Sequence, residues 1–222
     1  MRNLSRMACP SALLAVVLFL VHPLLSVAQI TAKQCFLAAP DTILPLLTEV
    51  NRADFVDFLD SRMRAEVSNR FEGKSVMTAL TDDYAHIRLS SSSTWEMKVL
   101  AMNDTTAVVC TVHTVCGPAC DSHVRFYTTD WQPLPVQHFL PPRPGMAEFL
   151  APLPADSVVT SAQREARAQA DVTLIRADLS PSEPTLTLTL TTPDTLPTET
   201  ADLLRPQLLP PRVYTWRDGR FE

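Results

Sequence analysis

Glycine, basic side chains and catalytic motifs are all scarce in this chain of 222 residues. The 4 glycines leave few positions for turns with positive φ or for backbone nests that hold phosphate. The 19 Lys and Arg residues are outnumbered by 24 Asp and Glu residues, which gives a net charge of −5. Nucleic acids and anionic membrane surfaces are both bound through basic side chains. The composition therefore argues against both as partners.

Motifs for nucleophilic or acid–base catalysis are lacking. The chain holds no G-x-S-x-G nucleophile elbow, and its serine run from Ser90 to Ser93 is typical of a turn. Asp82 and Asp83 are adjacent, so in a strand their carboxylates would point to opposite faces and could not share a proton. The sequence therefore predicts a protein that is not an enzyme, with no catalytic residues, no cofactor and no metal site.

The longest apolar run lies within residues 1–28. Arg2 and Arg6 precede the stretch ALLAVVLFLVHPLLSV, and small residues up to Ala28 occupy the positions that signal peptidase recognises. This pattern predicts a secretory signal peptide that is cleaved after Ala28. Loss of the two arginines would change the net charge from −5 to −7. No later run is long enough to span a membrane, so we expect export to the periplasm or the cell surface.

Residues 29–130 show a helical pattern that gives way to alternation. Asp41 and Asn51 are expected to cap two short helices. The apolar face of the second helix comprises Phe55, Phe58, Leu59 and Met63. Apolar and polar residues then alternate over 84–89, 95–99 and 124–127, while residues 108–112 are apolar on both faces at their start and predict a central strand. The pattern predicts a helix pair packed on a four-stranded antiparallel meander.

Two further segments complete the predicted organisation. Residues 131–154 hold seven prolines interleaved with Trp131, Phe139 and Phe149, which favours a stiff, packed crossing over a flexible linker. Residues 155–222 predict a smaller ββαβ-like half. Its elements are a helix over 161–170, strands over 172–179 and 185–191, a helix over 197–204 and a strand over 213–216. The predicted fold class is α+β. The element order is analogous to the beta-lactamase inhibitory protein-like fold.

Four cysteines follow residue 28, and two of them form the motif CGPAC. A thioredoxin-type site has two residues between its cysteines and lies at a helix N-terminus. Here three residues separate Cys116 from Cys120, and strand patterns flank both. We therefore expect them to face each other across a hairpin tip with Cα atoms about 5.5 Å apart, within disulfide range. Free thiols and a redox-active pair remain alternatives, and the pairing of Cys35 and Cys110 is left open.

A metal site is a further alternative for the same motif. His113 and His123 lie on the predicted strands that flank Cys116 and Cys120. Cysteine and histidine are the ligands that zinc prefers, but this spacing matches no recurrent zinc site. Positions on the strand faces are therefore the favoured interpretation of both histidines.

The segment PDTILPLLTEVNRADFVDFLDSRMRAEVSNRFEGKSVMTALTDDY carries a family resemblance. It is similar to the secreted Bacteroidales proteins classed as domain of unknown function 3256. The resemblance continues through Trp95–Lys98, FYTTDWQPL, TLTLTL and VYTWRDGRF. It implies an exported protein of a Gram-negative bacterium and brings no activity and no functional residues. The CGPAC motif is not part of the pattern associated with this family.

Three hypotheses for the function follow. The leading one is an exported, non-enzymatic binding or structural module with a protein or glycan partner. The second is a thiol–disulfide protein that uses Cys116 and Cys120. The third is a factor for envelope assembly or an inhibitor of another secreted protein. A cavity with several inward polar groups would favour an enzyme, and a flat sheet face would favour binding.

Overall fold

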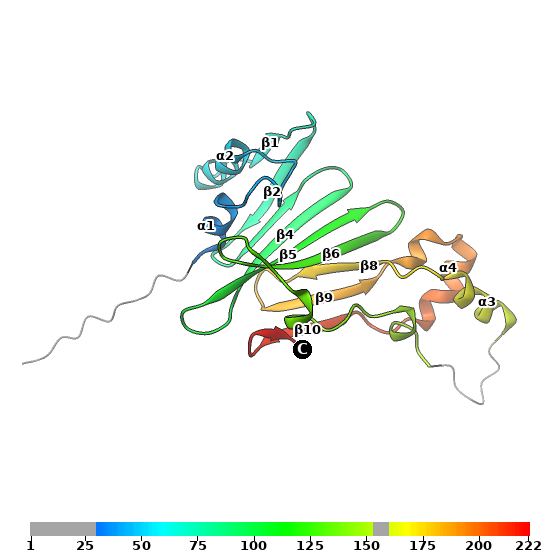
Figure 1. Cartoon of the computed structure of the whole chain (residues 1–222). Coiled ribbons are helices and arrows are strands. Elements are labelled where there is room, and N and C mark those ends of the chain that lie inside the picture. Colours follow the sequence, from blue (N-terminus) through cyan, green and yellow to red (C-terminus); the bar gives the residue numbers. More distant parts are fainter. Residues whose placement is uncertain (1–29, 153–159) are drawn as a thin grey trace, which may run out of the picture.

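The structure is a computed structural model that describes residues 30–152 and 160–222 (Figure 1). The predicted signal peptide, residues 1–28, lies outside the described residues. Within the two described ranges, no helix has both the length and the apolar character that crossing a membrane requires.

Helix α1 (Ala32–Leu37) begins at a capping box. The Thr31 hydroxyl accepts a hydrogen bond from the Gln34 N–H at 3.2 Å, and the Gln34 side chain accepts one from the Thr31 N–H at 2.9 Å. These two bonds satisfy N–H groups that a helix start leaves without partners. Cys35 and Phe36 are fully buried, so this short helix contributes to the core although the sequence analysis did not predict it.

Helix α2 (Glu49–Asp60) is the second predicted helix, with an earlier start. Thr48 is its N-cap, and Asn51 completes the capping box from the third helical position. Phe55 is fully buried, as its place on the apolar face predicts. Met63 lies beyond the helix end and is exposed, so the predicted face is shorter than expected.

The helix predicted to begin at Asp41 does not form, because residues 41–46 are a series of turns. The Asp41 carboxylate forms ion pairs with Arg52, at 3.0 Å, and with Arg70. Asp41 therefore links the turns to α2 and to the chain beyond it, and does not cap a helix.

A sheet of seven strands, larger than the predicted four, forms the centre of the fold. Its strands pair antiparallel in sequence order, and the four predicted strands are β3 to β6. The strands are β1 (Glu66–Ser68), β2 (Lys74–Leu80), β3 (Tyr84–Arg88), β4 (Ser93–Ala101), β5 (Ala107–Cys116), β6 (Cys120–Thr128) and β7 (Pro133–Leu134). Strand β2 does not show the alternation of apolar and polar residues that predicts a strand, because three consecutive residues are all buried: Ser75, Val76 and Met77.

The proline-rich segment packs against the protein through its aromatic residues. Trp131, Phe139 and Phe149 are buried. Two 3₁₀ turns, η1 (Val136–His138) and η2 (Met146–Glu148), lie along the segment. The last two residues of the predicted crossing, 153 and 154, lie outside the described residues.

The C-terminal part forms a second antiparallel sheet in the order β11-β10-β9-β8. Its elements lie close to the predicted bounds, and β11 was not predicted. They are α3 (Ser161–Gln169), β8 (Ile175–Leu179), β9 (Thr185–Leu190), η3 (Thr192–Thr195), α4 (Thr198–Leu204), η4 (Arg205–Gln207), β10 (Arg212–Arg217) and β11 (Arg220–Phe221). Figure 1 shows α3 and α4 beside each other at the end of the molecule away from α1 and α2.

The seven-stranded sheet has a core on each side. On one side, the helix face, α1 and α2 cover residues such as Ile87, Trp95 and Met97. On the other side, the sheet face, strands β8 to β11 cover residues such as Cys110 and Phe126. The sheet is therefore the middle layer between the helix pair and the second sheet.

Strand β8 is held to the sheet face through its own backbone. Three alternate N–H groups of β8 donate to side chains of the seven-stranded sheet at 2.8 to 2.9 Å: Ile175 to Asp121, Ala177 to Ser122 and Leu179 to Glu96. Because Glu96 lies on β4 and the other two acceptors lie on β6, β8 crosses the central strands of the sheet.

Candidate functional site

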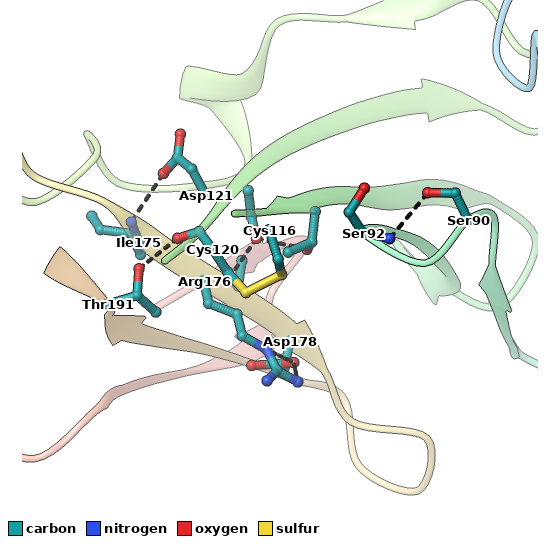
Figure 2. Close-up of a disulfide and its surroundings, with 12 residues drawn as sticks. Ser90, Ser92, Cys116, Cys120, Asp121, Ile175, Arg176, Asp178 and Thr191 are labelled. Carbon is teal, nitrogen blue, oxygen red and sulfur yellow. Dashed lines mark hydrogen bonds and ion pairs between the residues drawn. A yellow bond between two sulfur atoms is a disulfide. The ribbon is translucent and has the colours of Figure 1, made fainter. Parts of the chain in front are cut away.

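Cys116 and Cys120 form a disulfide at the tip of the β5–β6 hairpin (Figure 2). The sulfur atoms are 2.04 Å apart and the Cα atoms 4.0 Å apart. The expected spacing of about 5.5 Å belongs to a hydrogen-bonded pair of an antiparallel ladder. Here the Cys116 N–H donates instead to the carbonyl of Ser92 at 2.8 Å. The pair is therefore a non-hydrogen-bonded one, in which the Cα atoms lie closer together.

The hairpin tip is joined to the second sheet by hydrogen bonds next to the disulfide. The Thr191 hydroxyl donates to the carbonyl of Cys120, and Asp121 accepts from the Ile175 N–H (Figure 2). Strands flank both cysteines, as predicted, so neither sulfur lies at a helix N-terminus that would stabilise a thiolate.

The alternative ligand set, two cysteines with two histidines, does not converge. His113 and His123 are paired across β5 and β6, at positions of opposite parity to Cys116 and Cys120. Because successive side chains of a strand point to opposite faces, the histidines lie on the helix face and the disulfide on the sheet face. In the part of the chain that the structure describes, no group of three or more potential ligands could hold a metal ion.

The other two cysteines are buried thiols on opposite sides of the sheet. Cys35 belongs to the core under the helices and Cys110 to the core under the second sheet. Neither forms a disulfide with a described residue. Burial raises the pKa of Cys35 to about 11 and raises the pKa of Cys110 as well. Both therefore remain protonated near neutral pH and act as packing residues.

A buried polar cluster surrounds Glu96 in the layer between the two sheets. Its carboxylate accepts hydrogen bonds from the Leu179 N–H at 2.8 Å and from the Tyr84 hydroxyl at 3.3 Å. The His86 Nε2 atom lies 3.9 Å from it. Burial raises the pKa of Glu96 to about 7, raises the pKa of Tyr84 and lowers the pKa of His86. Glu96 does not line the cavity between the sheets, so we assign the cluster a structural role.

A second charged residue, Lys98, is buried two residues further along β4. Its side chain is 2% exposed, and its ammonium nitrogen lies 2.8 Å from the Asp83 carboxylate and 5.7 Å from the centre of the Tyr84 ring. Asp83 thus forms an ion pair with this ammonium group. Asp83 therefore has a structural role that does not require it to share a proton with the adjacent Asp82. The carbonyl of Asp82 accepts from the Ala32 N–H at 2.7 Å and joins α1 to this turn.

The main candidate site is an apolar cavity of about 430 Å³ between β6, the second sheet and the proline-rich segment. Val124, Leu140 and Ile175 are among its walls. Its complete lining is Ser122, His123, Val124, Val136, Gln137, Leu140, Pro141, Pro142, Arg143, Pro144, Ile175, Ala177, Leu188 and Tyr214. The volume and the mostly apolar lining with a few polar groups are typical of ligand pockets.

Arg143 holds the proline-rich wall of this cavity in place. Its guanidinium donates to the carbonyl of Ser122 at 2.9 Å and forms an ion pair with Asp121. Pro142 and Pro144 flank it in the sequence, and each proline fixes one backbone dihedral. The wall is therefore stiff and anchored to β6, which is the strand that forms the opposite side of the cavity.

The sequence pattern alone does not reveal this cavity. The clustered prolines with interleaved aromatic residues predicted a packed crossing, but the cavity depends on which strands the crossing meets. Its strand residues include Ala177 and Leu188. The apolar–polar alternation of their strands predicts that both are buried, but it does not show that a space beside them is unfilled.

Comparison with known proteins agrees with the resemblance inferred from the sequence. Comparison with curated proteins found no match. A solved structure, a domain of an uncharacterized protein from Porphyromonas gingivalis W83, is similar to this chain with a TM-score of 0.72 and 30% sequence identity. The similarity covers 86% of this chain and 96% of that chain. A model of the family described as proteins of unknown function, DUF3256, matches residues 24–221, and the chain therefore belongs to this family.

Proposed function

We propose that this protein is an exported, non-enzymatic binding module that takes an apolar group of a partner protein into the cavity between the two sheets. The observation that carries the proposal is the cavity of about 430 Å³. Interfaces gain most of their affinity where an apolar anchor fills a desolvated pocket with a polar rim. Val124, Leu140 and Ile175 supply the apolar wall, while Gln137 and Arg143 supply polar groups.

Export is the second part of the proposal. Residues 1–28 have the composition of a signal peptide. A disulfide between Cys116 and Cys120 suits an oxidising compartment such as the periplasm or the outer cell surface. Amino-terminal sequencing of the protein from the native envelope should begin at Gln29, and a protein that retains Met1 would contradict export by this route.

The thiol–disulfide alternative has less physical support. A redox cysteine needs a stabilised thiolate beside a helix start or a cation. Cys116 and Cys120 lie at the tip of a hairpin, and Arg176, which Figure 2 shows near them, is paired with Asp178 at 2.6 Å. Turnover in an insulin-reduction assay would favour this alternative. The role of an assembly factor or inhibitor is compatible with protein binding. The analogy to the beta-lactamase inhibitory protein-like fold stays part of the proposal and does not by itself assign a function.

Filling the cavity tests the proposal directly. Ala177 lines the cavity and is 2% exposed, so Ala177→Leu adds three carbon atoms to the space that a ligand would occupy. Uncharged N-phenyl-1-naphthylamine is a suitable probe because its fluorescence rises in apolar surroundings. The wild-type protein should enhance the fluorescence, and Ala177→Leu should weaken binding of the probe by at least tenfold.

The matched control is Ala147→Leu. Ala147 is exposed in η2 and does not line the cavity, so the same change in size should leave binding of the probe unaltered. Thermal unfolding of both variants shows whether they fold. A wild-type protein that does not bind the probe, or equal binding by the wild type and a folded Ala177→Leu variant, would contradict the proposed site. Cross-linked partners recovered from the envelope should likewise be lost selectively with Ala177→Leu.

A further inference from the structure

A second recess lies on the helix face of the β5–β6 hairpin, across the sheet from the apolar cavity. It has a volume of about 230 Å³ between these strands and the turns that precede α2. Its lining is Thr42, Ile43, Pro45, Leu46, Leu89, Trp95, Thr111, His113, His123, Arg125 and Tyr127. We call this recess the basic groove, because Arg125 and two histidines are its only ionisable groups apart from the Tyr127 phenol.

The strand register brings the three basic side chains together. His113 and His123 are directly opposite each other on β5 and β6, and Arg125 is opposite Thr111. Side chains at such positions are separated by about 5 Å at Cβ. All three basic residues are exposed. The groove therefore presents one guanidinium and two imidazoles to the same small space.

The guanidinium of Arg125 has no ion-pair partner among the residues that the structure describes. The one carboxylate of β6, Asp121, lies four residues before Arg125 and is already paired with Arg143. The nearest turn on the other side, residues 42–46, carries no charged side chain. The whole chain is acidic, with a net charge of −5. The recess therefore has the opposite charge to the rest of the chain, because its basic group has no acidic partner.

Desolvation and nearby positive charge both act on the two histidines. Although both rings reach solvent, their partial desolvation against the sheet is the main cause that lowers the pKa of His113 and His123, and the charge of Arg125 lowers both further. For His123, Arg143 acts in the same direction and Asp121 acts against it. Positive charge that opposes protonation of an imidazole also attracts an anion to the same place.

The rest of the lining is mostly apolar and could contact the uncharged part of a ligand whose anionic group lies near these charges. Ile43, Pro45 and Leu89 are apolar, and Trp95 adds an aromatic side chain. Thr111 adds a hydroxyl-bearing side chain to the lining. A ligand with an anionic group and a compact body, partly apolar, fits this combination better than a bare inorganic ion does.

We propose that the basic groove binds a carboxylate-bearing ligand, with Arg125 holding the carboxylate and His113 and His123 donating hydrogen bonds to it. Arginine presents parallel N–H donors that match the two oxygens of a carboxylate. The ligand could be supplied by an acidic sugar or by the carboxyl end of a peptide, since both have a carboxylate on a compact body. His123 borders both this groove and the apolar cavity, whereas Arg125 and His113 line the groove alone.

Isothermal titration with matched probes tests the inference. Glucuronate is compared with glucose, and N-acetyl-leucine with N-acetyl-leucine amide, so that each pair differs at the carboxylate. At least one carboxylate should bind, and its neutral partner should bind at least tenfold more weakly. The carboxylate that binds more tightly shows whether the ligand is an acidic sugar or the carboxyl end of a peptide. Absence of binding by both carboxylates at low ionic strength would overturn the proposal.

Substitution of the arginine provides the second arm. Arg125→Gln should lower affinity for the carboxylate at least tenfold, while Arg217→Gln, which changes an exposed arginine of the second sheet, should leave it unaltered. On saturation, the NMR-detected pKa of His113 and His123 should rise, because a bound carboxylate stabilises the imidazolium. Equal affinity for the wild type and the folded Arg125→Gln variant would overturn the assignment. Arg125→Gln should still bind N-phenyl-1-naphthylamine, so failure of one site is distinguishable from failure of the other.

Discussion

Replacement of the Glu96 carboxyl by an amide should change how the stability of this protein depends on pH. Glu96 is 8% exposed, and burial raises its pKa from an ordinary 4.5 to about 7. Between these pH values the folded state retains a proton that the unfolded chain has lost. The folded state is therefore favoured at the acidic end of this range, and its stability falls as the pH rises toward 7.

The magnitude follows from the difference between the two pKa values. A difference from 4.5 to about 7 corresponds to about 3 kcal/mol of unfolding free energy, lost fully above pH 7. In E96Q the amide oxygen can still accept from the Leu179 N–H, and the amide nitrogen can donate to the Tyr84 oxygen. The variant therefore keeps the hydrogen bonds of the carboxylate and removes its titration.

Urea unfolding at intervals between pH 4.5 and 8 provides the measurement. The stability of E96Q minus that of the wild type should rise by up to about 3 kcal/mol across this range. His86, whose pKa is lowered by burial, contributes stability that grows with pH, but both proteins contain it and it largely cancels in the difference. E183Q alters an exposed carboxylate and should run parallel to the wild type. If E96Q also ran parallel, Glu96 would not titrate near pH 7 and the reasoning from burial would be refuted.

Two other regions give predictions about stability. Phe55→Ala should cost about 3–5 kcal/mol in urea unfolding, because Phe55 is fully buried on the inner face of α2. Asp57 is exposed on the same helix, so Asp57→Ala should change stability by about 0.5 kcal/mol or less. The reverse ranking would contradict the observed helix face. The double variant Cys116→Ser, Cys120→Ser should lose about 2 kcal/mol or less of unfolding free energy, because the disulfide closes a very short loop. A larger loss, together with changed binding of the apolar probe, would show that the disulfide shapes the cavity.

The alternation of apolar residues was sufficient to predict the central strands, but it could not say what covers each face. Glu96 and Lys98 stand at the polar positions of β4, where an isolated meander would expose them to water. Both are buried because the second sheet lies on that face. A single sequence shows the period of a strand, whereas the partner of each face is a property of the whole fold.

Local signals account for the helices that were missed or shifted. Thr31 and Gln34, like Thr48 and Asn51, form capping boxes, and threonine followed three residues later by Gln is a readable start signal. The prediction at Asp41 relied instead on a cap residue that the fold uses for ion pairs. The cavity and the basic groove could not be predicted in this way, because each depends on segments that are distant in the sequence.

The hydrogen bonds that β8 makes to side chains have a consequence for self-association. β8 is the last strand of its sheet, and such a strand normally offers a row of free N–H groups on which another chain can add a strand. Here Asp121, Ser122 and Glu96 already accept from these groups. At the opposite end the sheet stops with β11, which has two residues. The second sheet is thus closed to extension by β-augmentation at one border and offers very little template at the other, which protects this sheet against edge-to-edge pairing with another chain.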